Sequence, residues 1–169
     1  MNVNEDSGEV LARLQWIKSP PMKLWNQSRL EDVRRLIFNT TGEKFSEKRL
    51  RMLPLDERFG MWALCQGDKD HGILWAMKLD SDTARVLAFS VSNHLQGQGF
   101  GAQGWSSFAE AARAQGINHV QLEVRQDNKS AIQLYHRRGL RPRGFLTGFY
   151  RGHDGWLMSG PLRIQPSSQ

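Results

Sequence analysis

Gln96-Gly97-Gln98-Gly99-Phe100-Gly101 is the stretch of this 169-residue chain that most narrows its fold. Its three glycines follow an apolar strand pattern over residues 84–91 and precede a helical pattern over residues 101–115. Glycine lets the backbone approach a ligand closely, and a helix N-terminus carries about half a positive charge. The stretch predicts a strand-to-helix turn that binds an anion such as a phosphate; a flexible turn at a helix start is the alternative.

A second stretch, Leu122-Glu123-Val124-Arg125-Gln126-Asp127-Asn128, ends a predicted strand over residues 119–125. Apolar and polar residues alternate there, so Glu123 shares one face of the strand with Gln121 and Arg125. A carboxylate in this place is either exposed to solvent or lines a cleft, where it can serve as a general base.

Tyr135 lies on the helix predicted over residues 129–138, which Gly139 ends. A phenol, with an ordinary pKa of about 10, can donate its proton to a leaving group; packing in the core is the alternative. Asn128, just before this helix, is either its N-cap or an amide that contacts a ligand.

The remaining patterns predict the order β-α-α-β-β-β-α-β-α-β-β. Residues 22–25 alternate briefly and predict the first strand, and Ser28-Arg29-Leu30-Glu31 predicts a capping box at the first helix. The other predicted helices and strands are residues 29–39, 46–53, 59–66, 72–79, 144–150 and 156–162. Antiparallel strands with crossover helices indicate an α+β fold, a single mixed, mainly antiparallel sheet flanked by helices.

The chain is long enough for one domain with an adequate core. Ser19-Pro20-Pro21 resists helix and sheet, so we expect residues 1–21 to be an N-terminal extension. Residues 10–17 of it remain a candidate for a short element packed on the domain. Residues 22–165 then form the domain, and residues 166–169 a frayed tail.

Composition narrows the classes of function. The net charge of +6 favours contact with acidic molecules; the alternative is that it only keeps the protein soluble. The lysines and arginines are scattered, and they lack the interleaved aromatic residues that are typical of RNA-binding modules. One cysteine excludes an internal disulfide, and the acidic start of the chain is unlike a signal peptide. No apolar run approaches a membrane span, and no His/Cys/Asp cluster suggests a metal site. We therefore expect a cytoplasmic protein without a metal.

Taken together, residues 84–162 resemble the GNAT superfamily of acetyl-CoA-dependent N-acetyltransferases. The pyrophosphate motif of that family is Gln/Arg-x-x-Gly-x-Gly/Ala, which residues 96–101 satisfy. Within that family, the chain is similar to the ribosomal-protein-alanine N-acetyltransferase branch. The similarity lies in residues 122–125, Asn128, residues 131–135 and residues 139–140. The resemblance implies the GNAT, or acyl-CoA N-acyltransferase, fold.

The resemblance also implies roles for residues. Glu123 matches the general base of the branch, and Tyr135, twelve positions later, its general acid. The residues that match cofactor contacts are Phe89, Ser90, Val91, Gln96, Gly97, Gln98, Gly99, Phe100, Gly101, Ala102 and Asn128. Gly97 and Gln98 stand where relatives often carry arginines, so phosphate binding would depend on backbone N–H groups.

The implied reaction is direct transfer of the acetyl group of acetyl-CoA to a primary amine, with a protein N-terminal α-amine as the acceptor of this branch. Residues 144–160, which help to shape the acceptor site in the family, diverge here. A small-molecule amine and a lysine side chain therefore remain alternative acceptors. A module that binds acetyl-CoA without catalysis is the alternative from another class of function, and a nucleic-acid-associated protein is a third.

Overall fold

The computed structural model describes residues 13–150 and 152–166. Its elements, in chain order, are β1 (Gln15–Lys18), η1 (Met22–Leu24), α1 (Gln27–Thr41), α2 (Glu47–Arg51), β2 (Met61–Gln66), β3 (Lys69–Lys78), β4 (Thr83–Val91), η2 (Asn93–Leu95), α3 (Phe100–Ala114), β5 (His119–Arg125), α4 (Lys129–Arg137), β6 (Arg141–Tyr150) and β7 (His153–Pro161). The predicted order of helices and strands is confirmed.

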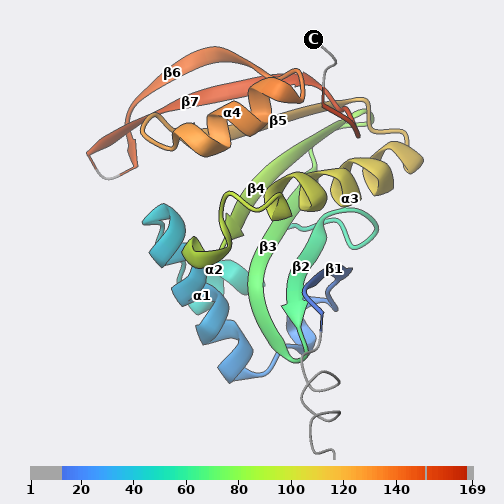
Figure 1. Cartoon of the computed structure of the whole chain (residues 1–169), viewed down its shortest axis with the longest axis vertical. Coiled ribbons are helices and arrows are strands. Elements are labelled where there is room, and N and C mark those ends of the chain that lie inside the picture. Colours follow the sequence, from blue (N-terminus) through green and yellow to red (C-terminus); the bar gives the residue numbers. More distant parts are fainter. Residues whose placement is uncertain (1–12, 151, 167–169) are drawn as a thin grey trace, which may run out of the picture.

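Seven strands form one sheet in the order β1-β2-β3-β4-β5-β7-β6 (Figure 1). Every neighbouring pair is antiparallel except β4 and β5, which run parallel and are joined by the crossover helix α3. The predicted α+β fold with a mixed, mainly antiparallel sheet is therefore confirmed.

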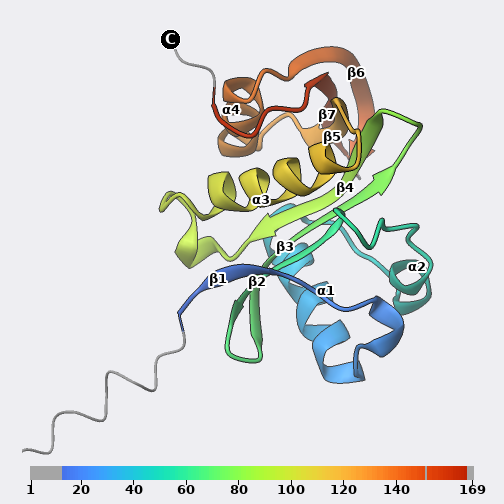
Figure 2. The same ribbon diagram turned by 90° about the vertical axis from the view of Figure 1, so that its right-hand side faces the viewer.

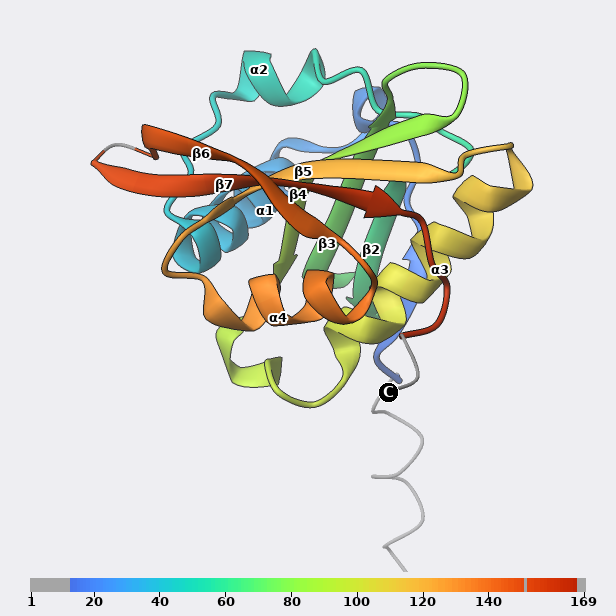
Figure 3. The same cartoon turned by 90° about the horizontal axis from the view of Figure 1, so that it is seen from above.

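Helices cover both faces of the sheet (Figure 3). On one face, α1 and α2 bury Leu30, Ile37 and Leu50 against Trp75 of β3. On the other face, α3 and α4 cover the larger hydrophobic core. Helix α3 contributes apolar residues three or four positions apart, which pack against apolar residues of the strands. The α3 residues concerned are Trp105, Phe108, Ala109 and Ala112.

The sheet divides in its middle. The pairing of β4 with β5 runs only from Thr83 to Val86, although β4 continues beside β3 to Val91. Leu87 is an extra residue at this point, because Ala76 pairs with Val86 and Trp75 with Ala88. Such a bulge bends a strand and ends regular pairing. Beyond it, β4 diverges from β5 (Figure 1).

The predicted first strand is wrong. Residues 22–25 contain the short helix η1, in which Met22 and Trp25 are both buried because a tight helical turn brings residues three apart to one side. The first strand is β1, which pairs antiparallel with β2 beside α3 (Figure 2). It lies in the segment predicted to be an extension, whose residues 1–12 are outside the described ranges, as are residues 167–169 of the predicted tail.

The start of α1 also differs from the prediction. Its N-cap is Asn26, whose side-chain oxygen accepts from the Arg29 N–H at 2.8 Å, and Ser28 lies inside the helix. Glu31 instead pairs with Arg34 at 2.7 Å. The predicted capping box is therefore wrong: asparagine is as good an N-cap as serine, and α1 begins at Gln27 with a single side-chain cap from Asn26.

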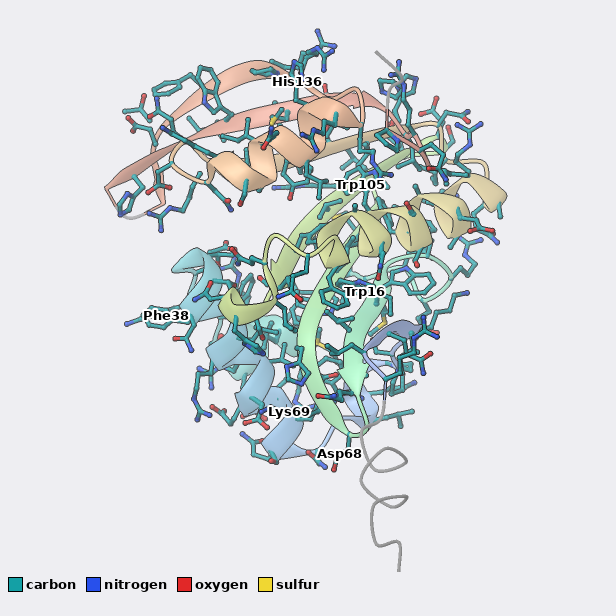
Figure 4. The ribbon with its side chains drawn as sticks, in the orientation of Figure 1. Trp16, Phe38, Asp68, Lys69, Trp105 and His136 are labelled. Atoms are coloured by element: carbon teal, nitrogen blue, oxygen red, sulfur yellow. The ribbon has the colours of Figure 1, made fainter. Side chains whose placement is uncertain are left out.

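Trp16 of β1 connects the edge of the sheet to α3 (Figure 4). Its indole Nε1 donates to the carbonyl of Phe100 at 2.8 Å, and its ring meets Phe89 edge-on with centroids 6.2 Å apart. The ring packs on Gly104, where an added Cβ would lie 2.6 Å from it. Glycine is therefore required at position 104 for this contact.

Gly104→Ala is expected to destabilise the protein by about 1–3 kcal/mol, because the methyl group overlaps the Trp16 ring, which is a rigid neighbour. Thermal unfolding should show a Tm lower by about 5 °C. Gly144→Ala is the matched control, because its Cβ would meet nothing closer than 3.8 Å. Equal losses in the two variants would contradict the packing argument.

Candidate active site

The glycine-rich turn between η2 and α3 has the conformation that the sequence predicts. Gly97 and Gly99 have φ values of 77° and 89°, which L side chains rarely adopt. Gly99 caps α3, and the first bond within the helix runs from Gln103 N–H to Gly99 carbonyl. The N–H groups before Gln103 are thus available at the helix start, and the first turn holds no acidic residue. The turn can attract an anion.

A cleft of about 460 Å³ opens between this turn, the far half of β4 and α4. It brings together nine of the residues predicted to bind the cofactor: Phe89, Ser90, Val91, Gln96, Gly97, Gly99, Gly101, Ala102 and Asn128. The hydroxyl of Ser90 is buried in the protein without a hydrogen-bond partner among the described residues. It is a polar group that a ligand in the cleft can satisfy.

Gln98 and Phe100 do not line this cleft. The Gln98 amide donates to the His94 carbonyl at 3.1 Å, and the Phe100 ring packs with Leu64, Val91 and Leu95. The side chains of both residues therefore shape the turn, and the prediction that these two residues bind the cofactor stays a prediction. This use of the two side chains could not be read from the motif.

A second cavity, of about 130 Å³, lies where β4 and β5 diverge. Glu123 and Leu87 line it from the two strands, and Glu43 lines it from the loop after α1. Four residues border both cavities: Thr41, Phe89, Asn128 and Tyr135. Tyr135, which was predicted to be the acid, thus forms part of the wall of both cavities.

Tyr135 is a buried residue with an exposed fraction of 6%. Its ring lies 5.5 Å from that of Trp105 on α3 and 6.4 Å from that of Phe89 on β4, centroid to centroid. Burial raises the pKa of its phenol well above the ordinary value, so the phenol is protonated at neutral pH. Its hydroxyl has no hydrogen-bond partner among the described residues, which leaves the proton available to a ligand.

Glu123 is not an isolated carboxylate. Its Oε1 accepts from Arg85 Nη2 at 2.7 Å, and its side chain is 17% exposed. The pair forms because the parallel register sets Arg85 beside Gln121, and Glu123 is the next residue on that face of β5. Arg85 is not among the residues predicted for the site, because only the pairing of strands distant in sequence brings it beside Glu123. The arginine fixes the direction of the carboxylate.

Glu43 is a second carboxylate that lines the smaller cavity, and it is not among the residues predicted for the site. Burial raises its pKa; the charge of Arg49 opposes this and the charge of Glu123 adds to it. Its carboxylate has no hydrogen-bond partner among the described residues. No local motif predicts this position for Glu43, because the residue reaches the cavity only when the loop after α1 folds over β4 and β5.

Glu43→Gln is expected to raise the Tm more at pH 8 than at pH 4. Because the pKa of Glu43 is raised in the folded state above 4.5, the folded protein loses stability as this group ionises. Below about pH 4.5 the group is protonated in both states, so glutamine brings little gain there. Calorimetric unfolding at the two pH values tests this, with exposed Glu57→Gln as the control. An equal Tm change at both values would contradict it.

Within the described ranges, no three His, Cys, Asp or Glu side chains gather in a way that could hold a metal ion. No helix in that part of the chain is long and apolar enough to cross a membrane.

Comparison with families of known proteins identifies the chain. A model of the acetyltransferase (GNAT) family matches residues 14–140. The chain belongs to this family. The family transfers acetyl groups from acetyl-CoA to amines, so the chain is an acetyl-CoA-dependent N-acetyltransferase. A search of curated proteins finds no match.

Solved GNAT structures share the fold at low identity. Ard1 from Thermoplasma volcanium has a TM-score of 0.74 at 22% identity, over 88% of this chain and 97% of that one. The ribosomal-protein-S18-alanine N-acetyltransferase from Escherichia coli has a TM-score of 0.72 at 20% identity, over 93% and 99%. A chain of the NatC complex bound to Gag peptide and CoA has a TM-score of 0.75 at 15% identity, over 89% and 99%.

Proposed function

We propose that this protein transfers the acetyl group of acetyl-CoA directly to a protein N-terminal α-amine. The observation that carries the proposal is that Tyr135 lines both cavities, which are therefore neighbours. A donor in the larger cleft and an amine in the smaller cavity meet there, between a proton donor and the carboxylate of Glu123. Direct transfer needs this arrangement, because both reactants must be held together.

The larger cleft suits acetyl-CoA on three grounds. The glycine-rich turn offers N–H groups to the diphosphate, the unpartnered Ser90 hydroxyl offers a polar contact, and the divergence of β4 from β5 leaves backbone groups of β4 free for the pantetheine arm. When bound, acetyl-CoA supplies the thioester carbonyl and a thiolate leaving group.

The chain's own residues then carry the protons. Glu123, held by Arg85, accepts a proton from the acceptor ammonium, directly or through water. Backbone N–H groups of β4 beside the Leu87 bulge polarise a carbonyl oxygen placed against them. Tyr135 donates its proton toward the leaving sulfur.

The acidic groups of the smaller cavity are Glu43 and Glu123, and three arginines also line it: Arg49, Arg85 and Arg125. Because Arg85 already pairs with Glu123, the carboxyl of Glu43 is the group there that an acceptor ammonium can pair with. Two of the structural neighbours, the ribosomal-protein-S18-alanine enzyme and the NatC complex bound to Gag peptide, support a protein N-terminus as the source of that ammonium.

Titration calorimetry with acetyl-CoA tests the proposed donor, with desulfo-CoA and adenosine diphosphate as control ligands. We expect saturable binding that needs the pantetheine arm. No binding at millimolar ligand would overturn the proposal.

An acceptor assay tests the second half of the proposal. Peptides with a free N-terminus are compared with the same peptides blocked at the N-terminus but carrying lysine, and with small amines. We expect acetylation of the free N-termini by mass spectrometry. Transfer to lysine or to small amines alone would overturn the choice of acceptor and leave the reaction standing.

A further inference from the structure

Arg138 is a buried arginine that the reaction described above does not use. It caps the C-terminus of α4 and is 4% exposed. It lies three residues after Tyr135, so both side chains project from the same side of the helix, and both line the larger cleft.

The guanidinium contacts neutral acceptors only. Nη2 donates to the Ala102 carbonyl at 3.3 Å, and Nη1 donates to the Ser106 hydroxyl at 3.3 Å and to the Ile164 carbonyl. An arginine has five N–H donors. At least two of them, including Nε–H, therefore lack an acceptor among the described residues.

Among the residues that the structure describes, no acidic group pairs with the positive charge of Arg138. None of its contacts is a carboxylate, and burial lowers the pKa of the guanidinium with no acidic group opposing the shift. A buried cation without a counter-ion is costly, and such groups are normally paired. The described contacts of Arg138 therefore leave its guanidinium able to pair with an anion.

The position of Arg138 indicates which kind of anion it can bind. Ala102, which accepts from Arg138, lies in the first turn of α3, where free N–H groups and the helix dipole already favour negative charge. Gly97 and Gln98 bring no cation to the turn itself. A phosphate group in the cleft satisfies both the helix start and the unpaired donors of Arg138.

We propose that Arg138, the buried one of the two arginines that line the cleft, binds a phosphate group there, and that bound CoA supplies the counter-ion of this buried charge; the other arginine, Arg137, is exposed. The inference rests on the proposed function, since it takes the cleft to be the CoA site. The proposal adds a binding residue at the end of α4 to the site. The glycine-rich motif of that site, residues 96–101, lies in the turn before α3 and in its first turn. The phosphate is either the diphosphate or the 3′-phosphate of CoA.

The experiment is titration calorimetry on wild-type protein and on Arg138→Gln, with CoA and with dephospho-CoA, which lacks the 3′-phosphate. We expect the variant to bind CoA about 10- to 100-fold more weakly, because charge-assisted hydrogen bonds to a phosphate are lost. A comparable loss with dephospho-CoA places Arg138 at the diphosphate; a loss confined to CoA places it at the 3′-phosphate.

Arg113→Gln is the matched control. It removes the same charge and a bond to a backbone carbonyl of the C-terminal segment, Leu162, but its side chain lies outside the cleft. We expect its affinity for CoA to stay within about twofold of wild type, because a distant exposed charge is screened. Equal affinity of Arg138→Gln and wild type for CoA would overturn the proposal, and so would equal losses in the two variants. If wild type itself binds no CoA, the proposed function fails instead.

A measurement on wild type covers the case in which Arg138→Gln does not fold. In protein labelled with ¹⁵N-arginine, the Nε–H resonance of Arg138 is assigned by its absence from Arg138→Lys. We expect it to shift on addition of inorganic diphosphate or of CoA, because the Nε–H donor gains an anionic acceptor. A resonance that does not move at saturating CoA would overturn the proposal.

Discussion

Tyr135→Phe is expected to lower kcat by about 10²-fold while the Kd for acetyl-CoA stays within about twofold of wild type. The ring keeps its contacts with Trp105 and Phe89, so only the proton donor is lost. The wild-type phenol retains its proton at neutral pH because burial raises its pKa. Steady-state kinetics with a thiol-detecting reagent gives kcat, and calorimetry gives the Kd.

Thermal unfolding is the control for this variant. The hydroxyl makes no hydrogen bond to a described residue, so the Tm should change little. A kcat equal to that of wild type, with the Tm unchanged, would remove Tyr135 from the role of acid. A weaker Kd with normal kcat would make it a binding residue.

Glu123→Gln should lower kcat/KM at pH 7 by about 10²-fold and move activity toward higher pH. Without the base, the amine must lose its proton to solvent before it binds. The rate then follows the fraction of free amine, which for an α-amine rises up to a pKa of about 8. A pH–rate profile with a peptide acceptor measures the shift.

Glutamine at position 123 is chosen because it keeps an oxygen for Arg85 and nearly the same shape. Glu110→Gln, on the exposed side of α3, is the matched control for loss of one carboxylate. If the pH profiles of wild type and Glu123→Gln coincide, Glu123 is not the base, and Glu43 becomes the next residue to test.

Local patterns predicted most of the fold. The alternation along β5 placed Glu123 opposite the buried face that contains Leu122 and Val124, as the structure has it. The glycines at 97 and 99 predicted a turn at the start of α3, and their left-handed conformations explain why glycine is needed. In each case the relevant forces act between residues close in sequence.

The remaining features depend on contacts between distant segments. Residues 22–25 alternate like a strand, but the turn after Pro21 buries Met22 and Trp25 together. β1 was not assigned to the sheet because most of its side chains are exposed at an edge, so it has no clear alternation of burial. The Arg85 pair, the burial of Glu43 and the unpaired charge of Arg138 arise only when β4, β5, the loop after α1 and the end of α4 come together.

Because β4 diverges from β5, this sheet has an inner edge in addition to its two outer edges. Peptide groups of β4 beyond the bulge lack a neighbouring strand on one side, as those of an edge strand do, yet helices stand on both sides of the opening. Slow hydrogen exchange, which the middle of a sheet normally shows, is therefore not expected for the amides there that face the opening. A narrow ligand with amides of its own can take the place of the missing strand.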